Sequence, residues 1–342
     1  MNDSSNKVTL LVETFDVFRG GIPRYNRELK VSNYKNIITF SNYIKNNAIT
    51  DKFLNFLYRR REILKELKNS IDSPVLHFTQ PEILFESSIL QGKKIVLTVH
   101  DLAVFGEMKN INLYALLRGK LFKRQFKYAI SRSDLILVNS SQTKEELMRR
   151  LNVNPLKIIV INHGISKSLR PLTKEKENTI GYFGGFNHRK RVDKLIEDFL
   201  HSKIKRDYKL FIYGSEDGDY KKLKYRYSKY RNVVFKGRVT DKEVTSVLNS
   251  FKYFVFPTSY EGLGLPIIEG IACGVPTFIY EDAKIPYEIY RYPIKIKQLD
   301  DISKYDYVEL RNNFLKLSKT VKERFSWTTL RKETEKAYRK LL

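Results

Sequence analysis

The feature that most constrains the fold is the alternation of short apolar runs with longer amphipathic stretches along the chain. Each run has the length of a buried strand, and most contain β-branched or aromatic residues. The runs are Val8–Val12, Ile37–Phe40, Val75–Phe78, Ile95–Val99, Leu135–Val138, Ile158–Ile161, Ile180–Phe183, Leu210–Tyr213, Val233–Phe235, Tyr253–Phe256 and Thr277–Tyr280. Strands that alternate with helices form parallel sheets covered on both faces, so the pattern predicts an α/β protein with two doubly wound domains.

The chain length of 342 residues also allows about two domains. We expect the boundary within Asn162–Thr173, a polar stretch that contains Gly164 and Pro171. Helical spacing predicts one helix over Ser140–Leu151, capped by Ser141, and another over Arg191–Leu200. A basic helix over about 328–342 could close either domain.

Lysine and arginine outnumber the acidic residues by 63 to 38, which gives a net charge of +25. This charge predicts attraction to polyanions, but does not choose among nucleic acid, anionic lipid and phosphorylated ligands. A single cysteine, Cys273, excludes an intramolecular disulfide and favours a cytoplasmic protein. The sequence shows neither a signal peptide nor an apolar run long enough for a transmembrane helix.

The clearest chemical motif follows the run Tyr253–Phe256, where a glycine-bearing loop leads to a helix that starts near Pro266. Ligands of open parallel sheets bind beyond the carboxyl ends of the strands. Glycines and unpaired amides at a helix N-terminus can hold a pyrophosphate without a metal. Glu261 and Glu269 bracket this loop, and ionised carboxylates accept hydrogen bonds from sugar hydroxyls. The alternative is that both glutamates are solvated or salt-bridged.

From Glu261 to Pro276 the sequence resembles the signature of retaining glycosyltransferases of family 4, which have the GT-B fold. This fold has two Rossmann-like domains with a cleft between them. The resemblance covers almost the whole chain, and the matching segments are Gly20–Tyr25, Thr98–Leu102, Asn139–Thr143, Asn162–Ile165, Tyr182–Gly185 with Arg189 and Lys190, Phe235–Val239 and Phe325–Trp327. It implies an acceptor-binding domain over 1–165, completed by the helix at about 328–342, and a donor-binding domain over 166–327.

The resemblance also assigns roles to individual residues. Glu261, His100 and Lys190 would be catalytic. The donor would be bound by Gly184, Gly185, Arg189, Lys190, Arg238, Val239, Glu261, Gly262, Leu263, Gly264, Leu265 and Glu269, with Glu269 on the ribose, Val239 on the base and Lys190 on the diphosphate. The acceptor would be bound by Gly20, Gly21, Arg24, His100 and Asp101. Many relatives have an arginine where this chain has Gly185, and Arg189 is the candidate replacement.

The implied activity is the retaining, metal-independent transfer of a hexose from a UDP- or GDP-linked sugar to a saccharide or lipid-linked acceptor. No cofactor is expected, and the D-x-D form of Asp217–Asp219 is interpreted as a polar turn. The residues leave two other functions open: a basic nucleic-acid-binding protein, and a sugar-nucleotide-binding relative without catalysis. Arg189, Lys190 and Arg191 could also be a solvated basic helix start.

Two basic amphipathic stretches, Phe53–Lys68 and Leu113–Arg132, fit either ordinary surface helices or peripheral contact with an anionic membrane on its inner face. No specific partnership with nucleic acid is expected, because the basic residues are spread throughout the chain.

Overall fold

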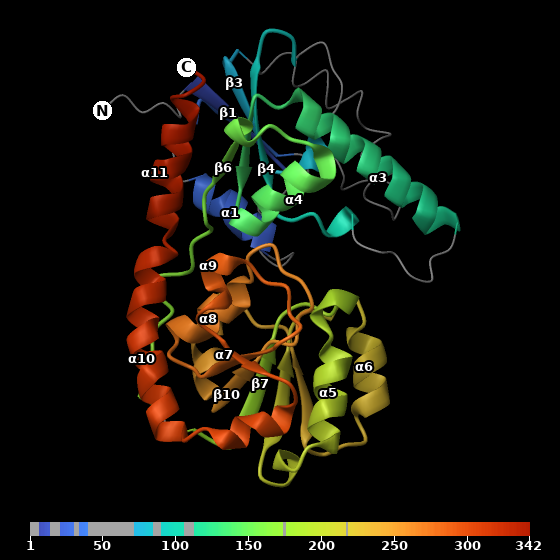
Figure 1. The fold of residues 1–342 in the computed structure, drawn as a ribbon, viewed down its shortest axis with the longest axis vertical. Coiled ribbons are helices and arrows are strands. Elements are labelled where there is room, and N and C mark those ends of the chain that lie inside the picture. Colours follow the sequence, from blue (N-terminus) through green and yellow to red (C-terminus); the bar gives the residue numbers. More distant parts are fainter. Residues whose placement is uncertain are drawn as a thin grey trace. The chain divides into compact units, whose positions relative to one another are not determined.

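The computed structural model describes residues 7–13, 21–30, 34–39, 72–84, 90–105, 113–173, 176–216 and 218–342. Gly20, Asp217 and the predicted helix Phe53–Lys68 lie outside this part of the chain. The chain divides into two compact units (Figure 1). The first unit combines Met1–Asn162 with Thr328–Leu342, and the second is His163–Trp327.

The first unit is built on a six-stranded parallel sheet in the order β2-β1-β3-β4-β5-β6. Its strands are β1 (Val8–Val12), β2 (Asn36–Thr39), β3 (Val75–Phe78), β4 (Lys94–Val99), β5 (Leu135–Val138) and β6 (Ile158–Val160). Its helices are α1 (Gly21–Leu29), α3 (Leu113–Arg132), α4 (Ser141–Leu151) and α11 (Trp327–Tyr338), with 3₁₀ turns at Pro81–Ile83, Ala103–Phe105 and Pro155–Lys157. The strand order changes direction between β1 and β3, which makes their carboxyl ends the favoured ligand position of this sheet.

The second unit has another six-stranded parallel sheet, in the order β12-β11-β10-β7-β8-β9. Its strands are β7 (Thr179–Phe183), β8 (Lys209–Tyr213), β9 (Val233–Gly237), β10 (Tyr253–Val255), β11 (Thr277–Tyr280) and β12 (Ile294–Ile296). Its helices are α5 (Val192–His201), α6 (Tyr220–Tyr227), α7 (Val244–Ser250), α8 (Leu265–Ala272), α9 (Tyr287–Tyr290) and α10 (Tyr307–Arg324), with 3₁₀ turns at His188–Lys190, Ile204–Arg206 and Leu299–Lys304. This is the strand order of the Rossmann fold, whose direction changes between the adjacent strands β7 and β10.

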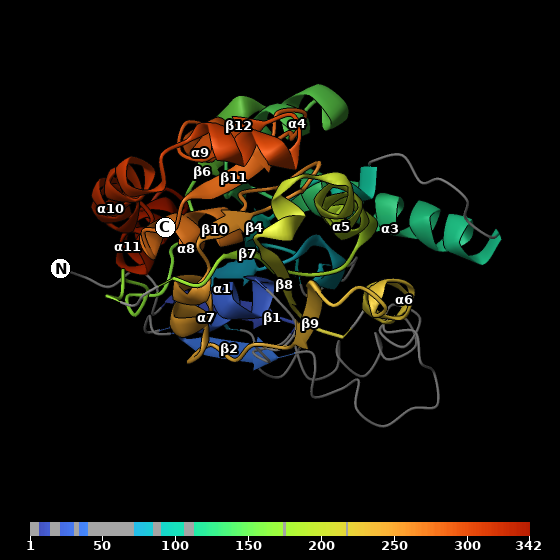
Figure 2. The ribbon, with the colours of Figure 1, turned by 90° about the horizontal axis from the view of Figure 1, so that it is seen from below.

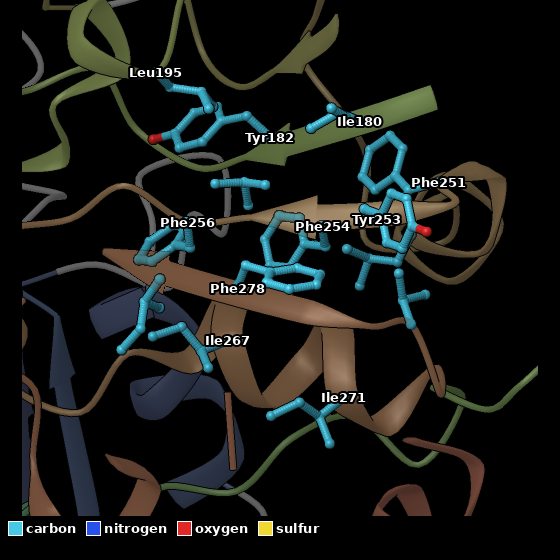
Figure 3. Close-up of a cluster of buried hydrophobic side chains, with 14 of the residues drawn as sticks. Ile180, Tyr182, Leu195, Phe251, Tyr253, Phe254, Phe256, Ile267, Ile271 and Phe278 are labelled. Carbon is cyan, nitrogen blue, oxygen red and sulfur yellow. The ribbon is translucent and has the colours of Figure 1, made fainter. Parts of the chain in front are cut away.

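Helices cover both faces of the second sheet: α5 and α6 lie on one side of it and α7 and α8 on the other (Figures 1 and 2). Figure 3 shows aromatic side chains of this sheet gathered in one cluster, with Ile267 and Ile271 of α8 beside it. Within the cluster, the rings of Phe251 and Phe254 stack with their centroids 6.1 Å apart. This packing fixes β10 and α8, and with them the loop that connects the two elements.

The predicted α/β class with two doubly wound sheets is confirmed, and each of the predicted apolar runs in the described residues forms a strand. The short run Ile294–Ile296 was not predicted because Lys295 interrupts it; it forms the edge strand β12. The predicted cap of α4 was wrong by one residue, since the hydroxyl of Ser140, not of Ser141, accepts the hydrogen bond from the Thr143 amide. No helix of the described residues is long and apolar enough to cross a membrane.

Candidate functional site

The candidate site lies in the second unit, where the strand order changes direction. β7 leads into Gly184 and Gly185 and then into the 3₁₀ turn His188–Lys190. Its neighbour β10 leads into the loop 257–264 and then into α8. Because both strands end at the same edge of the sheet, two segments about 70 residues apart in sequence meet there.

Backbone and arginine contacts hold these two segments together. The amide of Ser259 donates to the carbonyl of Arg189 over 2.8 Å. Arg191, in a left-handed conformation with φ of 48°, donates to the carbonyls of Pro257 at 2.8 Å and Thr258 at 2.9 Å. It also donates to both carboxylate oxygens of Asp282, at 2.6 and 2.8 Å. The hypothesis that Arg189, Lys190 and Arg191 form a solvated helix start is therefore wrong, because Lys190 is buried and Arg191 bonds the loop after β10.

Glu261 is the centre of the site and is only 5% exposed. Lys190 Nζ lies 2.5 Å from its Oε1, and Arg189 Nη1 lies 3.0 Å from its Oε2. The hydroxyl of Thr258 donates to Oε1 over 2.6 Å. Burial by itself would raise the pKa of Glu261, but the charges of Lys190 and Arg189 and the hydrogen bonds outweigh it, so the pKa lies below its usual value. Glu261 is therefore an ionised acceptor.

Aromatic rings line the cation side of this cluster. Lys190 Nζ lies 4.7 Å from the ring centroid of Phe256, a distance at which the ring attracts a cation. Tyr182 stacks on Phe256 with centroids 5.9 Å apart. Its hydroxyl donates to the carbonyl of Gly185 over 2.5 Å. Burial, with the negative charge of Glu261 adding to it, holds the pKa of Tyr182 well above its usual value, so Tyr182 is a neutral donor.

The loop that leads to α8 has a structural requirement for glycine. Gly264 has φ of +89°, and a Cβ there would lie 2.9 Å from Ile289 Cδ1. Leu265 begins α8, Pro266 lies in its first turn, and Gly262 and Leu263 are buried beside it. Glu269 lies on α8 and is 2% exposed. The first turn of a helix presents amide donors and a partial positive charge.

Arg238 and Val239 follow β9 at the same edge of the sheet, beyond β8. Gly237, the last residue of β9, has φ of +75°, and its carbonyl accepts from the Gly214 amide over 2.9 Å. Arg238 is exposed and Val239 is half-buried. The ends of β7, β8 and β9 therefore form a continuous row of loops.

In the first unit, His100 and Asp101 follow β4. His100 donates from Nε2 to the carbonyl of Thr79 over 3.0 Å, and burial lowers its pKa to about 4, so the ring is neutral. The carboxylate of Asp101 accepts from the Ala103 amide at 3.0 Å. Gly21 and Arg24 lie on α1, exposed and half-buried respectively.

Four residues at these strand ends were not predicted as site residues: Thr258, Arg191, Phe256 and Glu82. Thr258 and Phe256 lie within five residues of Glu261, so closer attention to the end of the strand could have identified them. Glu82 follows β3, at the carboxyl edge where the first sheet changes direction. Burial, with further contributions from Glu13 and Asp101, raises the pKa of Glu82 to about 7.

Among the described residues, no group of three or more His, Cys, Asp or Glu side chains is arranged to hold a metal ion. Asp219, the described acid of the D-x-D stretch, precedes α6, and its amide donates to the carbonyl of Phe186 over 3.1 Å.

Two family models match the chain, one to each half. The model described as "Glycosyltransferase Family 4" matches residues 17–169, and the model described as "Glycosyl transferases group 1" matches residues 166–291.

Individual proteins and a solved structure are similar to most of the chain. An uncharacterised glycosyltransferase of Methanocaldococcus jannaschii is 30% identical over 71% of this chain. O-antigen chain mannosyltransferase B of Escherichia coli is 23% identical over 57% of it. The alignments cover 65% and 55% of those relatives. The Anabaena protein HepE, solved in complex with UDP and glucose, has a TM-score of 0.71 at 13% identity and covers 97% of this chain and 98% of its own.

Proposed function

From the premise that this chain belongs to the family 4-like glycosyltransferases of the GT-B fold, we propose that it transfers a hexose from a nucleotide sugar to a saccharide or lipid-linked acceptor. The observation that carries the proposal is the buried cluster of Glu261, Lys190 and Arg189 at the switch point of the second sheet. It joins an acceptor for sugar hydroxyls to two cations suited to a diphosphate.

The donor would bind along the loops at the carboxyl edge of the second sheet. The diphosphate would contact Gly184, Gly185, Lys190 and Arg189 and the first-turn amides of α8, because fixed cations and amides stabilise the charge that develops on a leaving group. Glu269 would bind the ribose, and the segment Arg238–Val239 the base. UDP and GDP are both compatible with these contacts; UDP bound to HepE and the mannosyltransferase relative support a nucleotide-linked hexose without choosing the base.

The transfer would proceed with retention and without a metal. Lys190 and Arg189 supply positive charge beside the diphosphate, a role that a metal ion has in other transferases. The pKa of Glu261 lies below its usual value, so it is an ionised hydrogen-bond acceptor, and the proposed transfer needs it neither as a nucleophile nor as a base. Glu261 therefore positions the sugar, and a diphosphate oxygen on the same face of the sugar takes the proton from the acceptor hydroxyl.

The acceptor would bind to the first unit near His100, Asp101, Gly21 and Arg24. A neutral His100 can hydrogen-bond a hydroxyl, and Glu82 adds a carboxyl group at the switch point of that sheet. Peripheral contact with an anionic membrane is supported by α3, which exposes Leu117 and Leu121 together with Lys120, Arg124 and Lys127. Such contact would bring the enzyme to a lipid-linked acceptor.

The test is an assay of donor hydrolysis and of transfer to a panel of saccharide acceptors, with UDP-, GDP- and ADP-linked hexoses. Wild-type protein should consume one donor class, and chelation with EDTA should leave the rate unchanged.

Lys190→Ala should lower kcat by more than about tenfold, because the leaving group loses its buried cation. Glu261→Ala should abolish most of the turnover. Consumption of no donor, or wild-type turnover in both variants, would contradict the proposal.

A further inference from the structure

The two cations that we assign to the diphosphate are bound to a carboxylate of the same site. Lys190 Nζ and Arg189 Nη1 contact opposite oxygens of Glu261, at 2.5 and 3.0 Å. The side chains of Lys190 and Glu261 are 9% and 6% exposed. The attraction between charges shielded from water in this way is screened less than at the surface, and removing one partner leaves a costly buried charge.

An incoming diphosphate carries the same sign of charge as Glu261 and needs the same two cations. Carboxylate and diphosphate therefore compete for Lys190 and Arg189, and they repel one another across a site of low dielectric constant. The hydroxyls of a hexose need a Glu261 carboxylate whose oxygens are not held by cations.

We infer that Glu261 is an internal stand-in for the donor diphosphate: it holds Lys190 and Arg189 until the diphosphate draws them away, and only then accepts the hydroxyls of the sugar. The inference rests on the proposed function and adds an order of events to it. The diphosphate engages first, and its arrival prepares the sugar subsite, so a free hexose meets a carboxylate that is still neutralised.

Thr258 would keep the Glu261 carboxylate in place while its cation partners change. Its fully buried hydroxyl lies 2.6 Å from Glu261 Oε1, the same oxygen that Lys190 contacts. When Lys190 moves to the diphosphate, Thr258 continues to hold that oxygen. Thr258 is therefore a positioning residue that acts through Glu261.

The test is isothermal titration calorimetry with UDP, GDP and ADP on wild-type protein and Glu261→Gln. Glutamine keeps the shape of glutamate but holds the two cations weakly, so the Kd for the best-bound nucleotide should fall by about fivefold or more. Transfer from the corresponding nucleotide sugar should fall by about tenfold or more, because the charged acceptor for the sugar is lost. Tighter product binding with slower transfer is a combination that general damage to the site would not produce.

Asp282→Asn is the matched control, because Asp282 is a nearby carboxylate that pairs with Arg191 and not with Lys190. The nucleotide affinity of this variant should stay within about twofold of wild type, since the charge of Asp282 is exposed and screened.

In a Lys190→Met background, Glu261→Gln should tighten nucleotide binding by much less, because the cation for which Glu261 and the diphosphate compete is gone. Glu261→Asp, which keeps the charge but withdraws it from Lys190, should shift affinity in the same direction by a smaller factor, and circular dichroism confirms that each variant is folded.

Unchanged or weaker nucleotide binding in both Glu261→Gln and Glu261→Asp, with wild-type binding intact, would overturn the stand-in role alone. Wild-type protein that binds none of the three nucleotides would overturn the proposed function and this inference with it.

Discussion

At the scale of single residues, the proposed chemistry depends on how one buried carboxylate is held. Glu261 would be an unfavourable charge at 5% exposure if it stood alone, and three donors from two separate segments make it stable. In the proposed mechanism Glu261 positions sugar hydroxyls and does not take up a proton. Thr258 is the uncharged donor among the three, so its contact can be removed without changing any charge.

Thr258→Val removes that hydroxyl and keeps the size and branching of the side chain. The Kd for the nucleoside diphosphate should stay within about twofold of wild type, whereas kcat with the nucleotide sugar should fall by about tenfold, as expected for loss of a hydrogen bond to a charged group. Ser246→Ala is the control, because its exposed hydroxyl donates only within the first turn of α7, to the carbonyl of Glu243, and its loss should leave kcat unchanged. Equal kcat for wild type and Thr258→Val would remove Thr258 from the mechanism.

Glu261 and Lys190 were both predicted as site residues, but their contact was not predicted. They are 71 positions apart, and their contact depends on the adjacency of β7 and β10, which the strand order creates. The left-handed turn at Arg191 was equally invisible, because nothing in the amino-acid sequence distinguishes a lysine- and arginine-rich turn that is folded inward from one that is solvated. Both the contact between Glu261 and Lys190 and the turn at Arg191 depend on tertiary contacts between β7 and β10, and not on the local sequence pattern.

At the scale of elements, α8 and the loop before it depend on a backbone conformation that only glycine adopts readily. Runs such as Leu135–Val138 and Thr277–Tyr280 were predictable because buried parallel strands are continuously apolar. The edge strand β12 was not, since an exposed edge tolerates Lys295. The positions of the candidate residues at strand ends were predictable from the sequence, whereas the contacts that depend on which strands are neighbours were not.

Gly264→Ala tests the start of α8. The positive φ of Gly264 and its contact with Ile289 should make this variant less stable by about 1–3 kcal/mol, measured as the free energy of unfolding in urea. Gly185→Ala is the matched control, because a Cβ at Gly185 would meet nothing within 4 Å. Gly185→Ala should unfold like wild type but bind the nucleotide more weakly if the diphosphate occupies that space. Equal stability of the two variants would contradict this account of α8.

At the scale of the whole molecule, the chain returns to its first unit through α11. The hydroxyl of Tyr338 on α11 lies 2.6 Å from His77 Nδ1, and His77 Nε2 lies 2.8 Å from the hydroxyl of Thr98. Arg331 adds an ion pair with Glu28 at 3.1 Å. The last helix is thus anchored by a buried polar network, whose central group is a histidine.

Burial, with a smaller contribution from His100, lowers the pKa of His77 to about 3. His77 is therefore neutral in the folded protein but takes up a proton in the unfolded chain below its ordinary pKa of about 6.5. Its contribution to stability is complete above that pH and is lost, at up to about 1.4 kcal/mol per pH unit, as the pH falls towards 3. His77→Asn should flatten the fall of the unfolding free energy between about pH 6.5 and 4.5, and the exposed His201→Asn should not. A wild-type slope in His77→Asn would show that His77 is not the titrating group.

The central claim is that a nucleotide diphosphate docks at the end of β7 and β10 in the second unit. The most direct test is amide hydrogen exchange of the wild-type protein with and without saturating UDP or GDP. We predict slower exchange in peptides that cover residues 184–191 and 257–268, no change across α10, and loss of the effect in Lys190→Ala at the same nucleotide concentration. Protection confined to other segments, such as the basic helix α6, or no protection at all, would contradict the claim.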